Sequence, residues 1–203
     1  MTGDELLRTD RLVLRRLRPD DADDLFALDD DPEVMRFING GAPADRTAIE
    51  QAIARQTYDG GLGRWAAHER AGGTFVGWFG LIRILDGPLH AGPDVAELGY
   101  RLRRAVWGRG LATEGGDALL AYGFDRLGLR RIVAQTMTVN TASRRVMDKL
   151  GLTYVRTFHL EWPESIEGTE EGDVQYGLDY ADWRTRRMAD GTTKTTKPDI
   201  SLG

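Results

Sequence analysis

A glycine-spaced turn in the middle of the chain has the residue types best suited to binding an anion. Residues 107–112 read Trp-Gly-Arg-Gly-Leu-Ala and connect a strand-like run at 95–102 to a helix-like run at 113–127. Gly108 and Gly110 allow the backbone to bend and to approach a ligand closely. The first N–H groups of a helix have no partner inside it and attract a phosphate. The segment is a candidate phosphate site, and the alternative is a turn that only joins the two elements.

A second polar block follows the next strand-like run. Asn140 and Ser143 come directly after apolar residues 132–139 and open a helix that ends at residues 149–152. Asn140 suits an N-cap and can contact a ligand at the same time. Ser143 is either a plain first-turn residue or a polar group at a site. The glycine-rich turn itself has neither the Lys-Ser/Thr pair of a P-loop nor a G-x-G-x-x-G fingerprint.

Composition narrows the class of protein. The chain has 203 residues, of which 41% are hydrophobic and 29% charged, which suits one globular domain with a substantial core. The net charge of −5 does not suggest a nucleic-acid partner, and without cysteine there is no thiol nucleophile. The acidic N-terminus is no secretory signal, and no apolar run nears the roughly 20 residues of a membrane span. We expect a cytoplasmic protein with no membrane partner.

The elements that must position these residues can be assigned from apolar periodicity and turn residues. Strands are expected at residues 12–17, 65–69, 74–85, 95–102, 132–139, 152–162 and 173–180, and helices near 19–28, 45–58, 113–127 and 140–150. Asp45 is expected to cap the second helix. The order predicts an α+β sandwich around one central sheet, as a single domain at 1–189 with a loosely held tail at 190–203.

With these blocks in view, the chain resembles a GCN5-related N-acetyltransferase, in the branch of the ribosomal-protein N-terminal acetyltransferases. Matching pieces occur in the family's order at residues 11–15, 29–35, 97–100, 107–114 and 140–152, within a resemblance spanning 9–180. Trp107 departs from the Gln or Arg of the broad motif, but it is common in this branch. The resemblance implies a three-layer sandwich: a mostly antiparallel sheet, helices on both faces and a splayed strand pair for the cofactor.

The resemblance implies transfer of an acetyl group from acetyl-CoA to a primary amine. Glu97 is the candidate base, because its apolar neighbours would raise its pKa by burial. The alternative is a salt bridge with Arg101, which shares its face of the strand. Gly99 marks a point where backbone N–H groups can hold the oxyanion. Many family members use a tyrosine on the helix of the second block to protonate the leaving thiolate, and this helix has none. The resemblance to the ribosomal branch implies Ser143 as the acid, because it stands at the matching place. The residues implied for the cofactor are Leu98, Tyr100, Leu102, Arg103, Gly108, Arg109, Gly110, Leu111, Ala112, Thr113, Asn140 and Ser143.

The acceptor amine is the least defined part. Residues 29–43 and 159–172 are polar, acidic and irregular, and we expect them to wall its site. Asp31, Glu164 and Glu170 would suit a cationic acceptor, or they belong only to a solvated rim. The first function considered is acetylation of a protein N-terminus or peptide amine. The alternatives are a small-molecule N-acetyltransferase and a non-catalytic acyl-CoA-binding regulator. For the quaternary structure, a homodimer is considered beside a monomer. No metal is expected, because the three histidines, His68, His90 and His159, are scattered.

Overall fold

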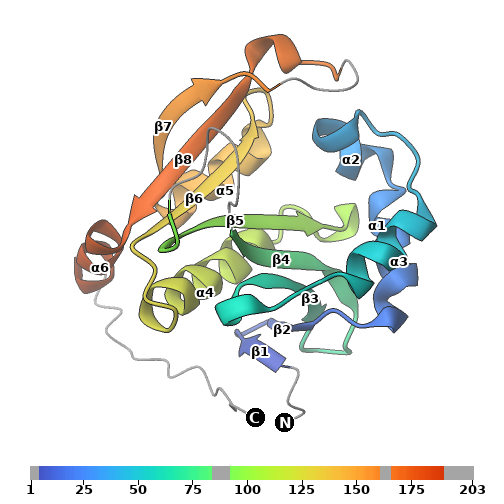
Figure 1. Cartoon of the computed structure of the whole chain (residues 1–203), viewed down its shortest axis with the longest axis horizontal. Helices are drawn as coiled ribbons and strands as arrows, with labels where there is room; N and C mark the ends of the chain where they lie inside the picture. The colour runs from blue at the N-terminus through green and yellow to red at the C-terminus, as the bar shows by residue number, and fades with distance from the viewer. Residues whose placement is uncertain (1–4, 84–91, 161–165, 190–203) are drawn as a thin grey trace.

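One eight-stranded sheet organises the protein (Figure 1). The computed structural model describes residues 5–83, 92–160 and 166–189. The strand order is β1-β2-β3-β4-β5-β6-β8-β7, and every neighbouring pair is antiparallel except β5–β6. The strands are β1 (Glu5–Arg8), β2 (Leu12–Arg16), β3 (Gly63–Glu69), β4 (Phe75–Arg83), β5 (Val95–Leu102), β6 (Arg131–Met137), β7 (Thr153–Phe158) and β8 (Asp173–Asp179).

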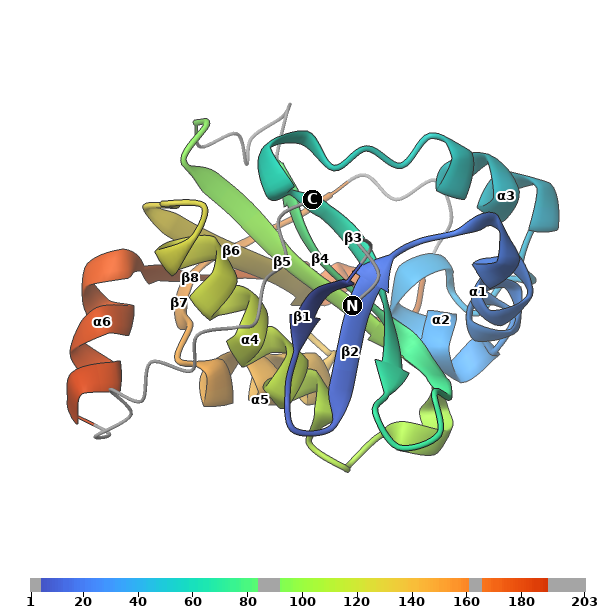
Figure 2. The same ribbon diagram turned by 90° about the horizontal axis from the view of Figure 1, so that it is seen from below.

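Helices cover both faces of this sheet, which confirms the predicted sandwich (Figures 1 and 2). α1 (Ala22–Asp29), α2 (Pro32–Asn39) and α3 (Arg46–Ala54) gather on one face, where their apolar side chains pack with Ala66 and Phe75. α4 (Leu111–Asp125) and α5 (Thr141–Leu150) lie on the other face. α6 (Tyr180–Ala189) follows β8. None of the helices in the described ranges is long and apolar enough to cross a membrane.

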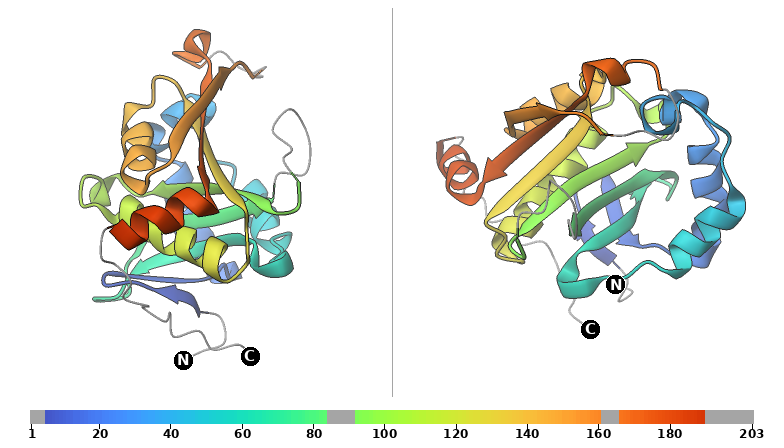
Figure 3. Two further views of the ribbon diagram at one scale, coloured as in Figure 1. Left: turned by 90° about the vertical axis from the view of Figure 1, so that its left-hand side faces the viewer. Right: turned by 45° about the horizontal axis from the view of Figure 1, so that its top comes forward.

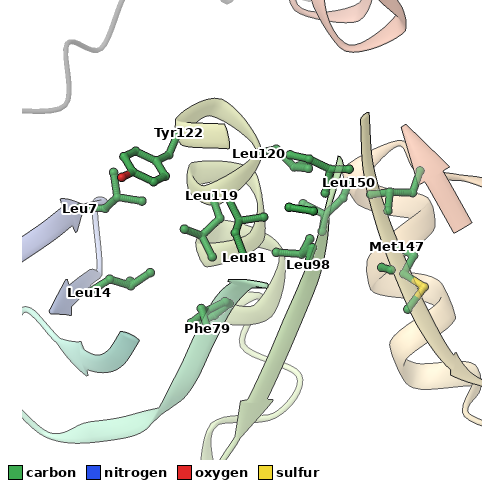
Figure 4. Close-up of a cluster of buried hydrophobic side chains, with 14 of the residues drawn as sticks. Leu7, Leu14, Phe79, Leu81, Leu98, Leu119, Leu120, Tyr122, Met147 and Leu150 are labelled. Carbon is green, nitrogen blue, oxygen red and sulfur yellow. The ribbon is translucent and has the colours of Figure 1, made fainter. Parts of the chain in front are cut away.

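The larger core cluster lies beneath α4 and α5 (Figure 4). Two glycines of α4 allow close packing. A Cβ on Gly115 would lie 2.4 Å from Cζ of Phe79, and one on Gly116 would lie 2.7 Å from Cδ1 of Leu150. α4 therefore lies directly on β4 and against α5, because its glycines replace side chains that would hold these elements apart. This packing fixes where the first turn of α4 stands relative to β5.

The parallel seam between β5 and β6 is short. Pairing runs only from Val95↔Arg131 to Glu97↔Val133, although β5 continues to Leu102 and β6 to Met137. β5 keeps its register with β4 as far as Leu102. Beyond Glu97 the two strands therefore diverge, and Figure 3 shows β6, β7 and β8 turned steeply away from β1–β5. The splayed strand pair implied by the resemblance is present.

Several expected boundaries were wrong. Residues 29–43 were expected to be irregular, but Pro32 starts α2, and the Asp31 side chain caps it by accepting from the N–H of Glu33. β1 and α6 were not expected, α3 ends at Ala54 rather than near Tyr58, and β7 ends at Phe158. The cap predicted at Asp45 is confirmed, since its side chain accepts from the N–H of Ala48. The tail at 190–203 lies outside the described residues.

Candidate functional site

The glycine turn before α4 has the backbone geometry of an anion site. Gly108 has φ of +74° and Gly110 has φ of +78°, a region that L side chains seldom adopt. Gly110 is the N-cap of α4 and offers no side chain to its first turn. The first-turn N–H groups of α4 have no acceptor within the helix, so they are available to a ligand. A Cβ on Gly108 would meet nothing within 4 Å, so this side of the turn faces open space.

A side-chain clamp from the first strand pair holds this turn. Arg11 donates from Nη1 to the carbonyl oxygen of Arg109 at 2.8 Å and from Nε to Glu114 at 2.6 Å. Thr9 donates its hydroxyl to the same carboxylate at 2.5 Å. Burial raises the pKa of Glu114, but the hydrogen bonds from Thr9 and Arg11 outweigh this and lower it below its usual value. Two of the segments that carry the family resemblance, residues 11–15 and 107–114, are therefore in contact in the folded chain.

The other large residues of the turn also have defined partners. The indole N–H of Trp107 donates to the carbonyl oxygen of Leu102 at 2.8 Å, which ties the turn to the end of β5. Arg109 forms an ion pair with Glu69 at 2.5 Å. Arg103, expected near the cofactor, forms an ion pair with Asp24 of α1 at 2.6 Å. Both arginine charges are thus partly neutralised, and the backbone N–H groups are the main anion donors left in the turn.

Glu97 stands at the last paired position of the β5–β6 seam. Desolvation raises the pKa of its carboxyl above the usual value, and the positive charge of Arg64 offsets part of this rise. Gln135 of β6 donates to Oε2 of Glu97 over a long 3.5 Å. The alternative salt bridge with Arg101 is not formed, because Arg101 pairs with Asp29 at 2.5 Å. Glu97 is therefore a carboxylate at the mouth of the splay with a raised pKa.

Ser143 is brought to the same splay from the opposite face. The carboxamide oxygen of Asn140 accepts from the N–H of Ser143 at 3.1 Å, which confirms the predicted cap of α5. The Ser143 hydroxyl oxygen lies 3.0 Å from that of Tyr100. Desolvation raises the pKa of Tyr100 to about 12, although its contact with Ser143 lowers it in part. Sequence reasoning assigned Tyr100 to the cofactor arm and missed this pair.

Strand alternation separates the two groups of β5 side chains. Glu97, Gly99 and Arg101 point to the face of α1, whereas Leu98, Tyr100 and Leu102 point to the face of α4 and α5. Leu98 and Leu102 are buried in the core, so any ligand beside them meets mainly backbone. The gap where β5 and β6 diverge thus has the Glu97 carboxylate on one face of the sheet and the hydroxyls of Tyr100 and Ser143 on the other.

The described parts of the two expected acceptor walls lie next to each other. Arg36 of α2 donates to Glu167 at 3.1 Å, and Gly40 stands near Ile166. Asp31, expected to attract a cation, forms an ion pair with Arg104 at 3.3 Å. Glu164 and His90 lie outside the described residues. Among the described residues, no group of three or more His, Asp or Glu side chains could hold a metal ion.

Comparison with known proteins decides the family. A family model described as an acetyltransferase (GNAT) domain matches residues 11–153. The chain belongs to the GNAT family. It is therefore an acetyl-CoA-dependent N-acetyltransferase, as the resemblance implied. A relative from Aspergillus fumigatus, FsC-acetyl coenzyme A-N(2)-transacetylase, is 36% identical over 186 residues, covering 87% of this chain and 77% of that protein.

Two solved GNAT structures share the fold. A spermidine N-acetyltransferase from Vibrio cholerae, in complex with CoA and spermine, has a TM-score of 0.72 at 18% identity, covering 87% of this chain and 99% of that one. A putative ribosomal-protein-serine acetyltransferase from Vibrio cholerae has a TM-score of 0.68 at 20% identity, covering 88% and 99%. At these identities the likeness extends to the fold alone.

Proposed function

We propose that this GNAT enzyme transfers the acetyl group of acetyl-CoA to a primary amine by direct attack in a ternary complex, with the thioester held in the splay. The observation that carries this proposal is the end of β5–β6 pairing at Glu97. The gap beyond it has Glu97 on one face and the Tyr100–Ser143 pair on the other. A reacting carbonyl in that gap has a base and hydroxyl donors on opposite sides, as acyl transfer requires.

The cofactor assignment follows the same geometry. The pyrophosphate would bind the backbone N–H groups of the turn from Gly108 to Thr113, where the clamp by Arg11 fixes the loop. The pantetheine arm would pair with the exposed edge of β5 from Leu98 to Leu102, as an added strand. Asn140 would cap α5 and contact the arm at once.

The proposed reaction uses these groups in turn. Glu97, directly or through water, accepts a proton from the acceptor ammonium, and the freed amine nitrogen attacks the thioester carbon. The N–C bond forms, the C–S bond breaks, and the sulfur leaves as a thiolate, while the nitrogen loses its second proton to solvent and becomes the neutral amide. The Ser143 hydroxyl, hydrogen-bonded to Tyr100, donates to that sulfur. Because a thiol has a pKa near 8.5, the thiolate also leaves without full proton transfer, so Ser143 contributes less than Glu97.

For the acceptor, we favour a small-molecule amine. The support is the 36% identical relative, whose name specifies transfer to an N(2) position. A protein N-terminus is the second candidate, supported by the sequence motifs of the ribosomal branch and by one solved neighbour described as acting on a ribosomal protein. A non-catalytic acyl-CoA-binding protein would have no need for a carboxylate of raised pKa at the splay.

Incubation with acetyl-CoA and a panel of amines tests the proposal, with free thiol as the readout. The panel contains diamines, amino acids, amino-acid amides and short peptides with free N-termini. We expect thiol release that depends on the acceptor and on Glu97. Binding of acetyl-CoA without release above the hydrolysis rate for every amine would overturn catalysis and favour a binding protein.

A further inference from the structure

Arg64 lies on the Glu97 face of the sheet and has no part in the chemistry proposed above. In the sheet register, Arg64 of β3 stands opposite Gly80 of β4, and Gly80 stands opposite Gly99 of β5. Glu97 is two residues from Gly99 on β5, so its side chain points to the same face. The path across the sheet from Arg64 to Glu97 therefore passes over two residues that have no side chain.

These two glycines let larger side chains lie flat across the sheet. A Cβ on Gly80 would lie 3.2 Å from Cγ of Arg64 and 3.0 Å from the carbonyl oxygen of Gly63, so the Arg64 stem crosses Gly80 closely. A Cβ on Gly99 would lie 3.5 Å from Cζ3 of Trp78, so the indole lies over Gly99. The approach to Glu97 is thus lined by Arg64, by the indole of Trp78 and by Ile82, which pairs with Glu97 and whose Cγ1 would lie 3.3 Å from a Cβ on Gly80.

Two guanidinium groups share the indole of Trp78, but within the described residues only that of Arg101 forms an ion pair. The guanidinium carbon lies 4.9 Å from the ring centroid for Arg64 and 5.5 Å for Arg101. Arg101 is paired with Asp29. For Arg64, the described part of the chain supplies no carboxylate within ion-pair distance. Arg64 is exposed to solvent. Desolvation and the charge of Arg101 lower its pKa, and the charges of Asp29 and Glu97 offset part of this decrease.

The spacing between Arg64 and Glu97 suits one small acceptor. Two strand intervals separate their backbones by about 9–10 Å, and two residues along the strand add about 6–7 Å in that direction. The long Arg64 side chain closes part of this distance, and each of the two groups shifts the pKa of the other by its charge. An amine held at Glu97 therefore has the guanidinium of Arg64 on the same face of the sheet, close enough for the two charges to interact.

We infer that the acceptor carries a carboxylate close to its reacting amine and that Arg64 binds this carboxylate. The substrate class is then an α-amino acid or a derivative that keeps its carboxylate. A guanidinium matches a carboxylate through two parallel hydrogen bonds, and stacking on Trp78 holds its plane in place. The ammonium of such a zwitterion faces Glu97 and its carboxylate faces Arg64. The inference rests on the proposed function, since it needs the amine to lie at Glu97.

Matched acceptor pairs test the inference. Ornithine and 1,4-diaminobutane, lysine and 1,5-diaminopentane, and alanine and ethylamine each differ only by the carboxylate. We expect the wild type to prefer the amino acid of at least one pair. At a pH above the acid limb of the rate profile, where Glu97 is ionised in both proteins, Arg64→Gln lowers kcat/KM for that amino acid about 100-fold and changes it less than threefold for the amine. Arg64→Lys keeps the charge but loses the paired hydrogen bonds, so we expect it to recover only part of the loss.

Arg184→Gln is the matched control, because Arg184 is an exposed arginine on α6, away from the sheet face described here. Calorimetry with acetyl-CoA confirms that each variant is folded. No thiol release by the wild type with any amine would overturn the proposed function itself. Release without preference for the amino acids, or an equal loss for both members of a pair in Arg64→Gln, would overturn the role of Arg64 while the acetyltransferase function stands.

Discussion

The hydroxyl oxygens of Tyr100 and Ser143 lie 3.0 Å apart, although 43 residues separate them in the chain. This contact joins β5 to the first turn of α5 across the open end of the β5–β6 seam. Because burial raises the pKa of Tyr100 to about 12, its hydroxyl stays protonated at neutral pH and can act as a donor. Ser143 is a poor acid alone, but a donor behind it stabilises negative charge on its oxygen.

Tyr100→Phe and Ser143→Ala are expected to act on one step. Each removes one hydroxyl from the pair, and we expect each to lower kcat several-fold while acetyl-CoA affinity holds. The double variant loses little more than the worse single variant, because either change breaks the same contact. The measurement is kcat at saturating substrates for the three variants. Losses that multiply would mean that the two hydroxyls act separately, and a collapse of cofactor affinity in Ser143→Ala would make Ser143 a cofactor ligand only.

Glu97→Gln keeps the shape of the side chain and removes its basicity. We expect kcat/KM for the amine to fall about 100-fold near neutral pH, and less at high pH, where more of the amine is already free. Asp125→Asn, an exposed carboxylate at the end of α4, is the matched control and should have no effect. An equal loss at every pH would indicate a structural role for Glu97.

The pH at which kcat falls on the acidic side of the pH–rate profile should depend on Arg64. Glu97 must be ionised to accept a proton, and burial raises its pKa, so the rate falls at a higher pH than for an ordinary glutamate. Arg64 favours the carboxylate and lowers this pKa. Arg64→Gln therefore moves the acid limb of kcat to higher pH, measured with an uncharged-tail amine such as ethylamine. An unmoved limb would show that another group governs it.

Gly110→Asp is expected to weaken acetyl-CoA binding at least tenfold, which is about 1.4 kcal/mol. The new side chain adds negative charge beside the pyrophosphate, and φ of +78° strains it. Gly72→Asp is a control for the strain, because Gly72 has φ of +90° in the hairpin turn between β3 and β4, with nothing within 4 Å of its Cβ position. Calorimetry compares the two variants. Unchanged affinity in a folded Gly110→Asp would remove the turn from the cofactor site.

The sequence predicts the elements whose signals are local. Apolar alternation identifies β5, and Asp45 and Asn140 mark helix starts, because a cap depends on residues within one turn. α2 was missed although its signal was present: Asp31 followed by Pro32 is a capped helix start, but the acidic run around it suggested a break. The family's motif order, rather than periodicity, indicated the splay.

Contacts between distant segments could not be predicted in this way. The clamp from Thr9 and Arg11 to Glu114 spans more than 100 residues, and no spacing rule links such positions. The path from Arg64 to Glu97 likewise depends on the register of three strands, since Gly80 and Gly99 become neighbours only once β4 pairs with β5. A single sequence carries no signal for that register beyond alternation.

Because only three residue pairs join β5 and β6, we expect the stability of the fold to depend on whether acetyl-CoA is bound between these strands. Beyond Glu97 each strand presents an unpaired inner edge, so a pantetheine arm laid between them would complete the sheet's own hydrogen-bond ladder. Ligand at 100 times its Kd then adds about 2.7 kcal/mol to the free energy of unfolding. We expect acetyl-CoA to raise Tm and to slow amide hydrogen exchange most in β5 and β6. While it is bound, the pantetheine arm of the cofactor would take the place of a further strand between β5 and β6.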